Sequence, residues 1–317
     1  MKIGNLKMKK IVVLGSTNTD MVISDKRLPK PGETISGGMF LMNPGGKGAN
    51  QAVAVARLSA KADGPARRSL GVGGCEFIAK VGDDLFGKET AANMKHEEID
   101  AKLIVDKKNA SGTALILVDA NGQNMISVAL GANGTLSPKD IAPYKKDIEN
   151  AAALLMQLET PIETVATAAK LAHAAGVMVV LNPAPAKKLP SALLRCVDWL
   201  TPNETEAEIL SGVKVVDEKS ATKAVAVLKK KGVKHVLVTM GSTGVYCGDC
   251  GTLFPCRNVK SVDCVAAGDT FNGAFVVALA EGKSTAEAID FAQKAAAISV
   301  TRPGAQSSVP FRWEVEK

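Results

Sequence analysis

Five short runs of β-branched and aliphatic residues, each near a helical pattern, constrain the fold of this chain more than any other feature. They occupy residues 11–14, 78–81, 154–158, 178–181 and 236–239. Apolar runs of this length are typical of buried strands, and helices between them connect strands that lie parallel. The alternation therefore predicts a doubly wound, mainly parallel α/β sheet with helices on both faces.

Three of the intervening segments carry signals for where a helix begins and ends. Thr160 and Ser284 are each followed three residues later by a glutamate, which is the spacing of a capping box. Pro161 is expected as the first helical residue, and Gly176 just beyond the last one. A third helix is expected over residues 217–231, with a glycine directly after it.

A second kind of segment interrupts this pattern with apolar and polar residues in strict alternation. Such alternation is typical of half-buried strands, and Asn121-Gly122 is a strong hairpin turn signal. We predict one domain over residues 1–317 with a small, mostly antiparallel sheet inserted as a lid. Its strands come from two stretches, at about 17–41 and 109–129, with alternation at 19–24, 34–41, 114–117 and 124–128.

The composition favours a globular protein that acts on small molecules. Of the 317 residues 46% are hydrophobic, and the net charge of +7 comes with only 4% aromatic residues, too few to stack nucleic-acid bases. No apolar stretch approaches membrane-spanning length, and no secretory segment precedes the six cysteines, which predicts reduced thiols in a cytoplasmic protein. Cys247 and Cys250 have zinc-like spacing but no second pair, so structural cysteine is favoured.

Small residues lead into an apolar helix within residues 263–280, and an aspartate stands near its start. A small-residue turn that opens a helix exposes backbone N–H groups at the positive end of the helix dipole, where a polyphosphate binds well. Asp269 would there accept a proton from a reacting hydroxyl. On local sequence alone, an ordinary N-cap with Gly268 easing the turn is an equally good interpretation.

A second glycine-rich turn, at residues 43–50, precedes another helical run. Its glycines admit a polar ligand close to the backbone, while Lys47 and Asn50 add hydrogen-bond donors. The spacing of a Walker phosphate loop is absent. The first strand also lacks the glycine pattern of dinucleotide-binding oxidoreductases, so that class is disfavoured.

Polar residues follow the first and third predicted strands. Asn18 and Asp20 come after one, and Glu159 ends the other. Each could merely terminate a strand, but ligands of open α/β sheets bind beyond the carboxyl ends of the strands. The coincidence of several polar residues at strand ends favours a site.

Two later segments have two interpretations each. Asn203 and Glu206 stand at capping-box spacing, which is the favoured account, but they could equally orient water molecules bound to Mg²⁺. After the strand that ends at Thr239, the glycines at 241 and 244 suit a hairpin or a nucleotide-cradling turn about equally.

Taken in order, these segments resemble the ribokinase-like (PfkB) carbohydrate kinase family from about residue 11 to residue 310. The two signature regions of that family are matched by Gly45-Gly-Lys-Gly-Ala-Asn50 and Ala266-Ala-Gly-Asp-Thr-Phe-Asn-Gly273. Further matches are residues 157–159, 182–185, 202–206 and 301–308. The resemblance implies an ATP-dependent sugar kinase whose β-sheet lid also makes a homodimer interface.

The resemblance also implies roles for single residues. Asp269 corresponds to the catalytic base, and the anion-hole amides correspond to Ala266, Ala267 and Gly268. The sugar is expected at Asn18, Asp20, Gly46, Lys47, Asn50, Glu159 and Asp269. ATP is expected at Asn203, Thr239, Gly241, Ser242, Gly244, Gly268 and Gln293, with Glu206 associated with Mg²⁺.

A monovalent cation, usually K⁺, is implied beside the anion hole. Its expected ligands, several through backbone carbonyls, are Asp263, Val265, Ser299, Arg302, Gly304 and Ser308. The family often has Asp-Thr-Thr where this chain has Asp263-Cys264-Val265, a change that carbonyl ligands would survive. Residues 59–74 are predicted to form an exposed loop, which is longer than usual for the family.

The implied acceptor is the 5-hydroxyl of D-ribose. Deoxyribose, fructose, another sugar or a nucleoside are alternatives that keep the same chemistry. A binding protein that has lost catalysis is disfavoured, because Asp269 and the small residues before it are intact.

Overall fold

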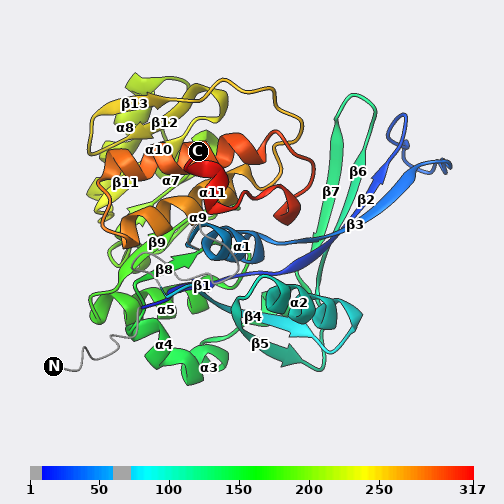
Figure 1. Ribbon diagram of the computed structural model, residues 1–317, viewed down its shortest axis with the longest axis horizontal. Coiled ribbons are helices and arrows are strands. Elements are labelled where there is room, and N and C mark those ends of the chain that lie inside the picture. The colour runs from blue at the N-terminus through cyan, green and yellow to red at the C-terminus, as the bar shows by residue number, and fades with distance from the viewer. Residues whose placement is uncertain (1–8, 60–72) are drawn as a thin grey trace.

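The computed structural model describes residues 9–59 and 73–317. In these residues the main sheet has nine strands in the order β13-β12-β11-β10-β9-β8-β1-β4-β5 (Figure 1). Their bounds are β1 Ile11–Leu14, β4 Cys75–Gly82, β5 Asp100–Asp106, β8 Ala153–Met156, β9 Met178–Leu181, β10 Trp199–Leu200, β11 His235–Thr239, β12 Gly244–Cys247 and β13 Thr252–Pro255. All pairs from β5 to β11 are parallel, and only β12 and β13 are antiparallel.

Helices cover both faces of this sheet. The longer ones are α1 Lys47–Ser59, α2 Leu85–His96, α5 Ile162–Ala174, α7 Glu204–Ser211, α8 Glu218–Lys230, α9 Ala267–Ala280 and α10 Thr285–Ser299. The short ones are α3 Pro138–Ile141, α4 Lys145–Glu149, α6 Ser191–Leu194, α11 Arg312–Val315 and the 3₁₀ turns η1 Gly131–Thr135, η2 Ala142–Tyr144, η3 Gly241–Thr243 and η4 Gln306–Ser308. No helix in the described part of the chain is long and apolar enough to cross a membrane.

The core lies in two layers, one on each side of the central strand β1. Ile11 and Val13 pack with α1, α9 and α10, whereas Val12 and Leu14 pack with α5, α7 and α8. Successive side chains of a strand point to opposite faces, so a strand covered on both sides is apolar at every position. The predicted doubly wound, mainly parallel α/β fold is confirmed.

Most of the predicted helix boundaries agree with the structure. Asp217 and Ser284 accept N–H bonds as the N-caps of α8 and α10, and Ser284 completes its capping box. Gly176 and Gly232 follow the C-caps of α5 and α8 with positive φ, a conformation that costs glycine little. The signals in these segments were sufficient because they act within one turn of the chain.

The predicted start of α5 is wrong by one residue. Its N-cap is Pro161, with φ −59° and ψ 133°, and no side chain caps the helix. Because Pro161 stays extended instead of opening the first turn, Thr160 lies too far from the helix for its hydroxyl to cap it. The Thr160 hydroxyl is buried without a partner in the described residues.

The second, smaller sheet has the order β3-β2-β6-β7, from β2 Asn18–Ser24, β3 Met39–Gly45, β6 Gly112–Val118 and β7 Asn124–Ala129. It extends away from the main sheet on the right of Figure 1. The pair β2 and β6 is parallel, and the two outer pairs are antiparallel. The alternation predicted over residues 34–41 is misplaced, because β3 begins only after Gly37, whose φ is +105°. Most of the predicted loop at 59–74 lies outside the described residues.

Candidate active site

Five charged groups that sequence analysis singled out share one region beyond the carboxyl ends of the main-sheet strands. Burial, together with the nearby charges of Glu159 and Asp269, raises the pKa of Asp20 to about 6. The negative charges of Asp269, Glu159 and Glu206 together raise the pKa of the Lys47 ammonium. Residues up to 249 positions apart in the chain, from Asp20 to Asp269, are thus brought together.

Asp269 lies in the first turn of α9 but does not cap it. The N-cap of α9 is Ala266, and no side chain makes a cap hydrogen bond. The carboxylate, in a residue only 6% exposed, instead faces α1, where it accepts hydrogen bonds from Asn50 Nδ2 at 3.0 Å and Gln51 Nε2 at 2.9 Å. The N-cap interpretation of Asp269 is therefore wrong, and its side chain is placed for another purpose.

The surroundings of Asp269 shift its pKa in opposing directions. Burial raises its pKa, while Lys47 and the amides of Asn50 and Gln51 oppose that shift by favouring the charged form. Because burial outweighs these opposing contributions, the pKa of Asp269 is raised overall, and a carboxylate with a raised pKa is a stronger base than one in water. The arrangement can take a proton from a hydroxyl brought against it.

A chain of buried amides holds this carboxylate in place. Gln157 Nε2 donates to Gln51 Oε1 at 2.5 Å, and Gln51 Nε2 also donates to Asn182 Oδ1 at 3.2 Å. A Cβ at Gly15 would lie 2.1 Å from Gln157 Oε1, so the chain needs a glycine there. Sequence analysis gave Gln51 no role, because its complete burial in α1 and its contact with Asp269 become visible only in the structure.

Glu159 fixes the glycine-rich turn at the start of α1. Its carboxylate accepts hydrogen bonds from Ser16 Oγ at 2.5 Å and from the Lys47 N–H at 3.0 Å. A Cβ at Gly48 would lie 2.5 Å from the Ser16 nitrogen, so this glycine allows the close approach of the two backbones. Ser16, which the sequence interpretation left out, therefore links the β1–β2 turn to α1.

The remaining predicted sugar-side residues face the same space. Asp20 stands on β2 opposite the last residues of β3, and a Cβ at Gly45 would lie 2.1 Å from Asp20 Oδ2. Gly46 has φ +86°, which a residue with a side chain adopts only under strain. Asn50 Oδ1 is buried and has no partner among the described residues, so it is an acceptor available to a ligand hydroxyl.

The turn before α9 has the geometry of an anion site. Ala266 holds a left-handed conformation with φ +58°, which is strained for a residue with a side chain. The Ala267 N–H donates to the Cys264 carbonyl at 3.3 Å. Around Gly268 a Cβ would meet no atom within 4 Å, so this part of the helix N-terminus is open to a ligand.

The residues expected at the nucleotide also lie together. Asn203 and Glu206 form the capping box of α7, and a β-bridge joins Asn203 to Thr239. The turn at 241–243 begins and ends in positive-φ glycines, Gly241 and Gly244, with Ser242 between them.

The Phe254 carbonyl connects this turn to α10. It accepts a hydrogen bond from Gln293 Nε2 at 3.0 Å, and it would lie 2.0 Å from a Cβ at Gly244. Gln293 and the glycine turn are thus neighbours across β13.

The expected cation ligands come from two loops that one carboxylate ties together. Asp263 accepts the Val265 N–H at one oxygen and the Gly304 N–H at the other, each at 2.9 Å. Ser299 and Ser308 are fully buried, and each hydroxyl donates to a carbonyl within its own turn. The Arg302 guanidinium pairs with Glu314, so only its backbone carbonyl is left for a cation.

A buried carboxylate base beside the open N-terminus of a helix, on a doubly wound sheet with a second small sheet, defines a small-molecule kinase of the ribokinase-like fold. Residues 8–312 match the model of the pfkB family carbohydrate kinases. The chain belongs to this family, and its fold and site are those of an ATP-dependent sugar kinase.

Relatives of known name cover nearly the whole chain. It is 47% identical to the ribokinase of Haemophilus influenzae, over 96% of this chain and 97% of the relative. It is 36% identical to the deoxyribokinase of Salmonella typhimurium, over 95% of each. The structure of Arabidopsis thaliana ribokinase complexed with ribose and ATP superposes with a TM-score of 0.87 at 34% identity, covering 97% of each chain.

Proposed function

We propose that this protein transfers the γ-phosphoryl group of ATP to the 5-hydroxyl of D-ribose. The observation that carries the proposal is Asp269, a buried carboxylate held by two amides at the open N-terminus of α9. The ribokinase of Haemophilus influenzae, at 47% identity, supports ribose as the acceptor. The deoxyribokinase relative keeps deoxyribose as the alternative.

On the sugar side, the groups present offer both donors and acceptors to the hydroxyls of a small sugar. Asp20 and Glu159 accept hydrogen bonds, Lys47 donates them, and Asn50 Oδ1 is an unused buried acceptor. Asn18 and Gly46 border the same space. A site that leaves no unpaired polar group only when a polyhydroxylated ligand is bound selects such ligands.

Asp269 acts as the general base in this proposal. The acceptor hydroxyl lies against it, and its proton passes to the carboxylate as the oxygen attacks the γ-phosphorus in line with the leaving oxygen. Asn50 and Gln51 keep the carboxylate aimed at the hydroxyl throughout. The amides of Ala266, Ala267 and Gly268 lie at the positive end of α9, where in this proposal they stabilise the negative charge of the transferred group. The Ala267 N–H then exchanges its 3.3 Å hydrogen bond to the Cys264 carbonyl for one to that group.

On the nucleotide side, Asn203, Thr239, Gly241, Ser242, Gly244 and Gln293 border ATP in this proposal. Glu206 fits a role beside Mg²⁺, since it offers a carboxylate oxygen, the donor this ion prefers. Burial raises the pKa of Glu206, while the Asn203 N–H and Lys47 favour its charged form. Bound Mg²⁺ would supply charge neutralisation at the phosphates.

The loops that Asp263 joins fit a monovalent cation. They bring together carboxylate, hydroxyl and carbonyl oxygens, and oxygen donors suit K⁺. Bound K⁺ would stiffen the turn before α9 and add positive charge near the anion site. The proposed ligands are Asp263, Val265, Ser299, Arg302, Gly304 and Ser308.

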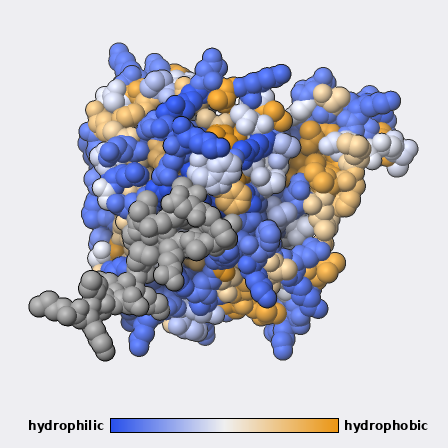
Figure 2. Space-filling model, viewed as in Figure 1, coloured by the Kyte–Doolittle hydropathy of each residue, from blue (hydrophilic) through white to orange (hydrophobic). Residues whose placement is uncertain are grey.

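The small sheet is proposed to act both as a lid and as a dimer interface. One of its faces carries Asp20. On the opposite face lie Ile23, Phe40, Met42, Leu115 and Met125, which are all exposed. Figure 2 shows hydrophobic residues gathered on this part of the surface. An apolar face of this kind marks an interface, and a second copy of the chain is the proposed occupant.

We place the protein in the cytoplasm, where its six cysteines, all unpaired, would stay reduced. In this proposal its partners are a sugar and ATP.

An ADP-release assay over a sugar panel, with Mg²⁺ and with or without K⁺, tests the function. Ribose should give the highest kcat/KM, and Asp269→Asn should lower kcat about 10²- to 10⁴-fold. Asp147→Asn, a substitution of the same kind on α4, is the control and should leave kcat unchanged. Better turnover of deoxyribose or a hexose would reassign the acceptor, and no sugar-dependent ADP release would reject the kinase.

A further inference from the structure

Asn133 lies outside every motif of the sequence and is fully buried beside the proposed sugar site. It belongs to η1, directly after the last strand of the small sheet. Its Oδ1 accepts the Thr17 N–H at 3.0 Å. Its Nδ2 donates to the Thr17 carbonyl and to Asn18 Oδ1, both at 2.9 Å.

These contacts determine which end of the Asn18 amide faces the sugar. The Thr17 N–H can only donate, so the Asn133 atom against it is the oxygen, and the atom facing Asn18 is the nitrogen. Asn18 must then offer its oxygen to Asn133. Its Nδ2, which makes no hydrogen bond to any described residue, is left for a ligand.

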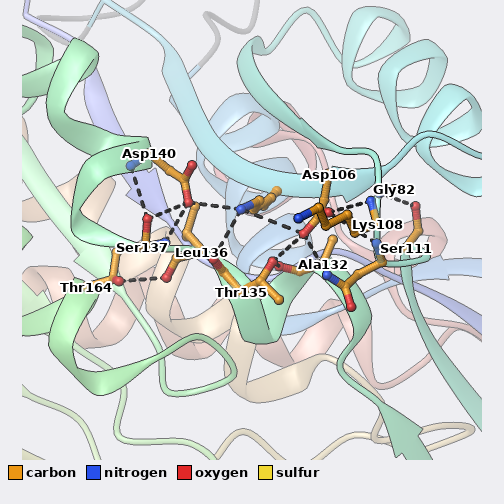
Figure 3. A network of polar contacts seen from close by, with 12 residues as sticks. Gly82, Asp106, Lys108, Ser111, Ala132, Thr135, Leu136, Ser137, Asp140 and Thr164 are labelled. Atoms are coloured by element: carbon orange, nitrogen blue, oxygen red, sulfur yellow. Dashed lines mark hydrogen bonds and ion pairs between the residues drawn. The ribbon is translucent and has the colours of Figure 1, made fainter.

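The segment that carries Asn133 is fixed to the main domain, as Figure 3 shows. Thr135 Oγ1 donates to Asp106 Oδ2 at 2.7 Å, and Lys80 Nζ donates to the Thr135 carbonyl at 3.2 Å. The Leu136 carbonyl accepts from Thr164 Oγ1 at 2.7 Å. These anchors belong to β4, β5 and α5, so the position of Asn133 is fixed by the main domain. Asn133 in turn fixes the side chain of Asn18 on the small sheet.

A glycine makes room for this contact. Gly112 stands opposite Asn18 in the register of β2 and β6. A Cβ there would lie 2.1 Å from Asn133 Nδ2 and 2.3 Å from Asn18 Oδ1. Any side chain at position 112 would push the two amides apart, so Gly112→Ala breaks the contact while both asparagines keep their identity.

We infer that Asn133 is a positioning residue for sugar recognition, which holds Asn18 so that its Nδ2 donates to one sugar hydroxyl. The inference rests on the proposed function. The hydroxyl that meets Asn18 accepts this hydrogen bond, while the ionised Asp20, which can only accept, receives a hydrogen bond from another hydroxyl. A sugar that lacks the first hydroxyl leaves a buried donor unpaired, since Asn18 is only 6% exposed.

The test is Asn133→Asp, which keeps the shape of the side chain and replaces its donor by an acceptor. Asn18 then turns its nitrogen toward position 133 and its oxygen toward the sugar. The KM for ribose should rise about 10- to 100-fold, with the KM for ATP unchanged. Asn150→Asp on the surface, whose amide reaches only the Lys146 carbonyl, is the matched control and should change neither.

A sugar series separates positioning from a merely structural role. One monodeoxy ribose lacks the hydroxyl that Asn18 meets, and its KM should hardly change in Asn133→Asp, so discrimination against that sugar falls. In an Asn18→Ala background the Asn133 substitution should have no further effect on ribose affinity measured by calorimetry. Equal losses on ribose and every deoxy sugar, or full additivity with Asn18→Ala, would overturn the inference.

Gly112→Ala is the second variant, should Asn133→Asp fail to fold. It should reproduce the same selective loss of discrimination, and an unchanged sugar profile in a folded Gly112→Ala protein also counts against the inference. Wild-type protein that turns over no sugar would instead reject the proposed function itself. The two failures are therefore distinguishable.

Discussion

The main sheet and the small sheet differ in where their apolar residues are buried. Every residue of β1 and β8 is buried, because helices cover both faces of the main sheet. Every residue of β7 is exposed, and so are the first four of β3. Apolar strands gain stability when they are covered, so the main sheet is buried within one chain, whereas the small sheet leaves apolar residues exposed, as expected for the proposed interface.

The two carboxylates singled out for the reaction also belong to different regions of the molecule. Asp269 is held by α1 and α9 of the main domain, whereas Asp20 stands on β2 of the small sheet. The proposed base is thus held by hydrogen bonds within the main domain, whereas Asp20 on the small sheet is half-buried with a raised pKa. Substitutions in the two regions should therefore have different effects.

The largest expected difference concerns stability. Phe275 in α9 is fully buried, stacked on Phe271 and edge-on to Trp199, so Phe275→Ala should lower the free energy of unfolding by about 3–5 kcal/mol. Phe40, 62% exposed on β3, makes the matched substitution Phe40→Ala, which should cost less than about 1 kcal/mol. Urea denaturation of dilute protein measures both.

Self-association of the protein should instead be more sensitive to Phe40→Ala than to Phe275→Ala. Phe40→Ala should weaken a dimer in sedimentation velocity, because it removes apolar area from the proposed interface. Equal unfolding losses from the two variants would show that the small sheet is as self-sufficient as the main one, and an unchanged sedimentation profile would remove the face of Phe40 from the interface.

The same contrast explains how much of the fold could be predicted. The five central apolar runs all became strands of the main sheet, because burial on both faces demands apolar residues at every position. The capping signals of α8 and α10 worked because they are local. The misplaced β3 shows the limit: alternation continues through Gly37 and Gly38, and only the pairing with β2 decides where the strand begins.

In the site, the charged residues and the amides inside motifs, such as Asn18 and Asn50, were predicted, whereas the amides that support them were not. Asp20, Glu159 and Asp269 stand out beside strand ends or helix starts. Gln51 and Asn133 act through partners more than 100 residues away, Asp269 and Asn18. A single amide has no spacing pattern, so its role becomes visible only when the fold sets it against its partner.

Asp20 on the small sheet should make the stability of the protein depend on pH. Its pKa is about 6 in the folded protein against an ordinary value of 3.8, so at about 1.4 kcal/mol per pH unit its ionisation costs about 3 kcal/mol of stability. This cost is absent below about pH 4, grows as the pH rises, and is complete above about pH 6. Asp20→Asn should therefore stabilise the ligand-free protein by up to this amount at pH 8 and hardly at all at pH 4.

Thermal unfolding at the two pH values measures this effect. The same variant should bind ribose more weakly, because an amide cannot replace the charged acceptor. If Asp20→Asn lowered the stability at pH 8, the carboxylate would be stabilising the small sheet, and the contrast between the main sheet and the small sheet would fail at this residue.

The smallest expected effect is a shift in the pH dependence of kcat when Asp269 loses its hydrogen bond from Gln51. Gln51→Met keeps the length of the side chain but removes the hydrogen bond that lowers the pKa of Asp269. Activity needs Asp269 ionised, so kcat rises with pH through this pKa, and losing the bond should move that rise upward by about one pH unit, as expected for one hydrogen bond of about 1.4 kcal/mol. At a pH above the rise kcat should recover toward the wild-type value, whereas mere damage to the packing of α1 would lower kcat equally at every pH.

Gln123→Met, in the exposed hairpin turn of the small sheet, is the control and should leave the pH profile of kcat unchanged. A pH-independent loss in Gln51→Met would mean that the main domain places the base without tuning it.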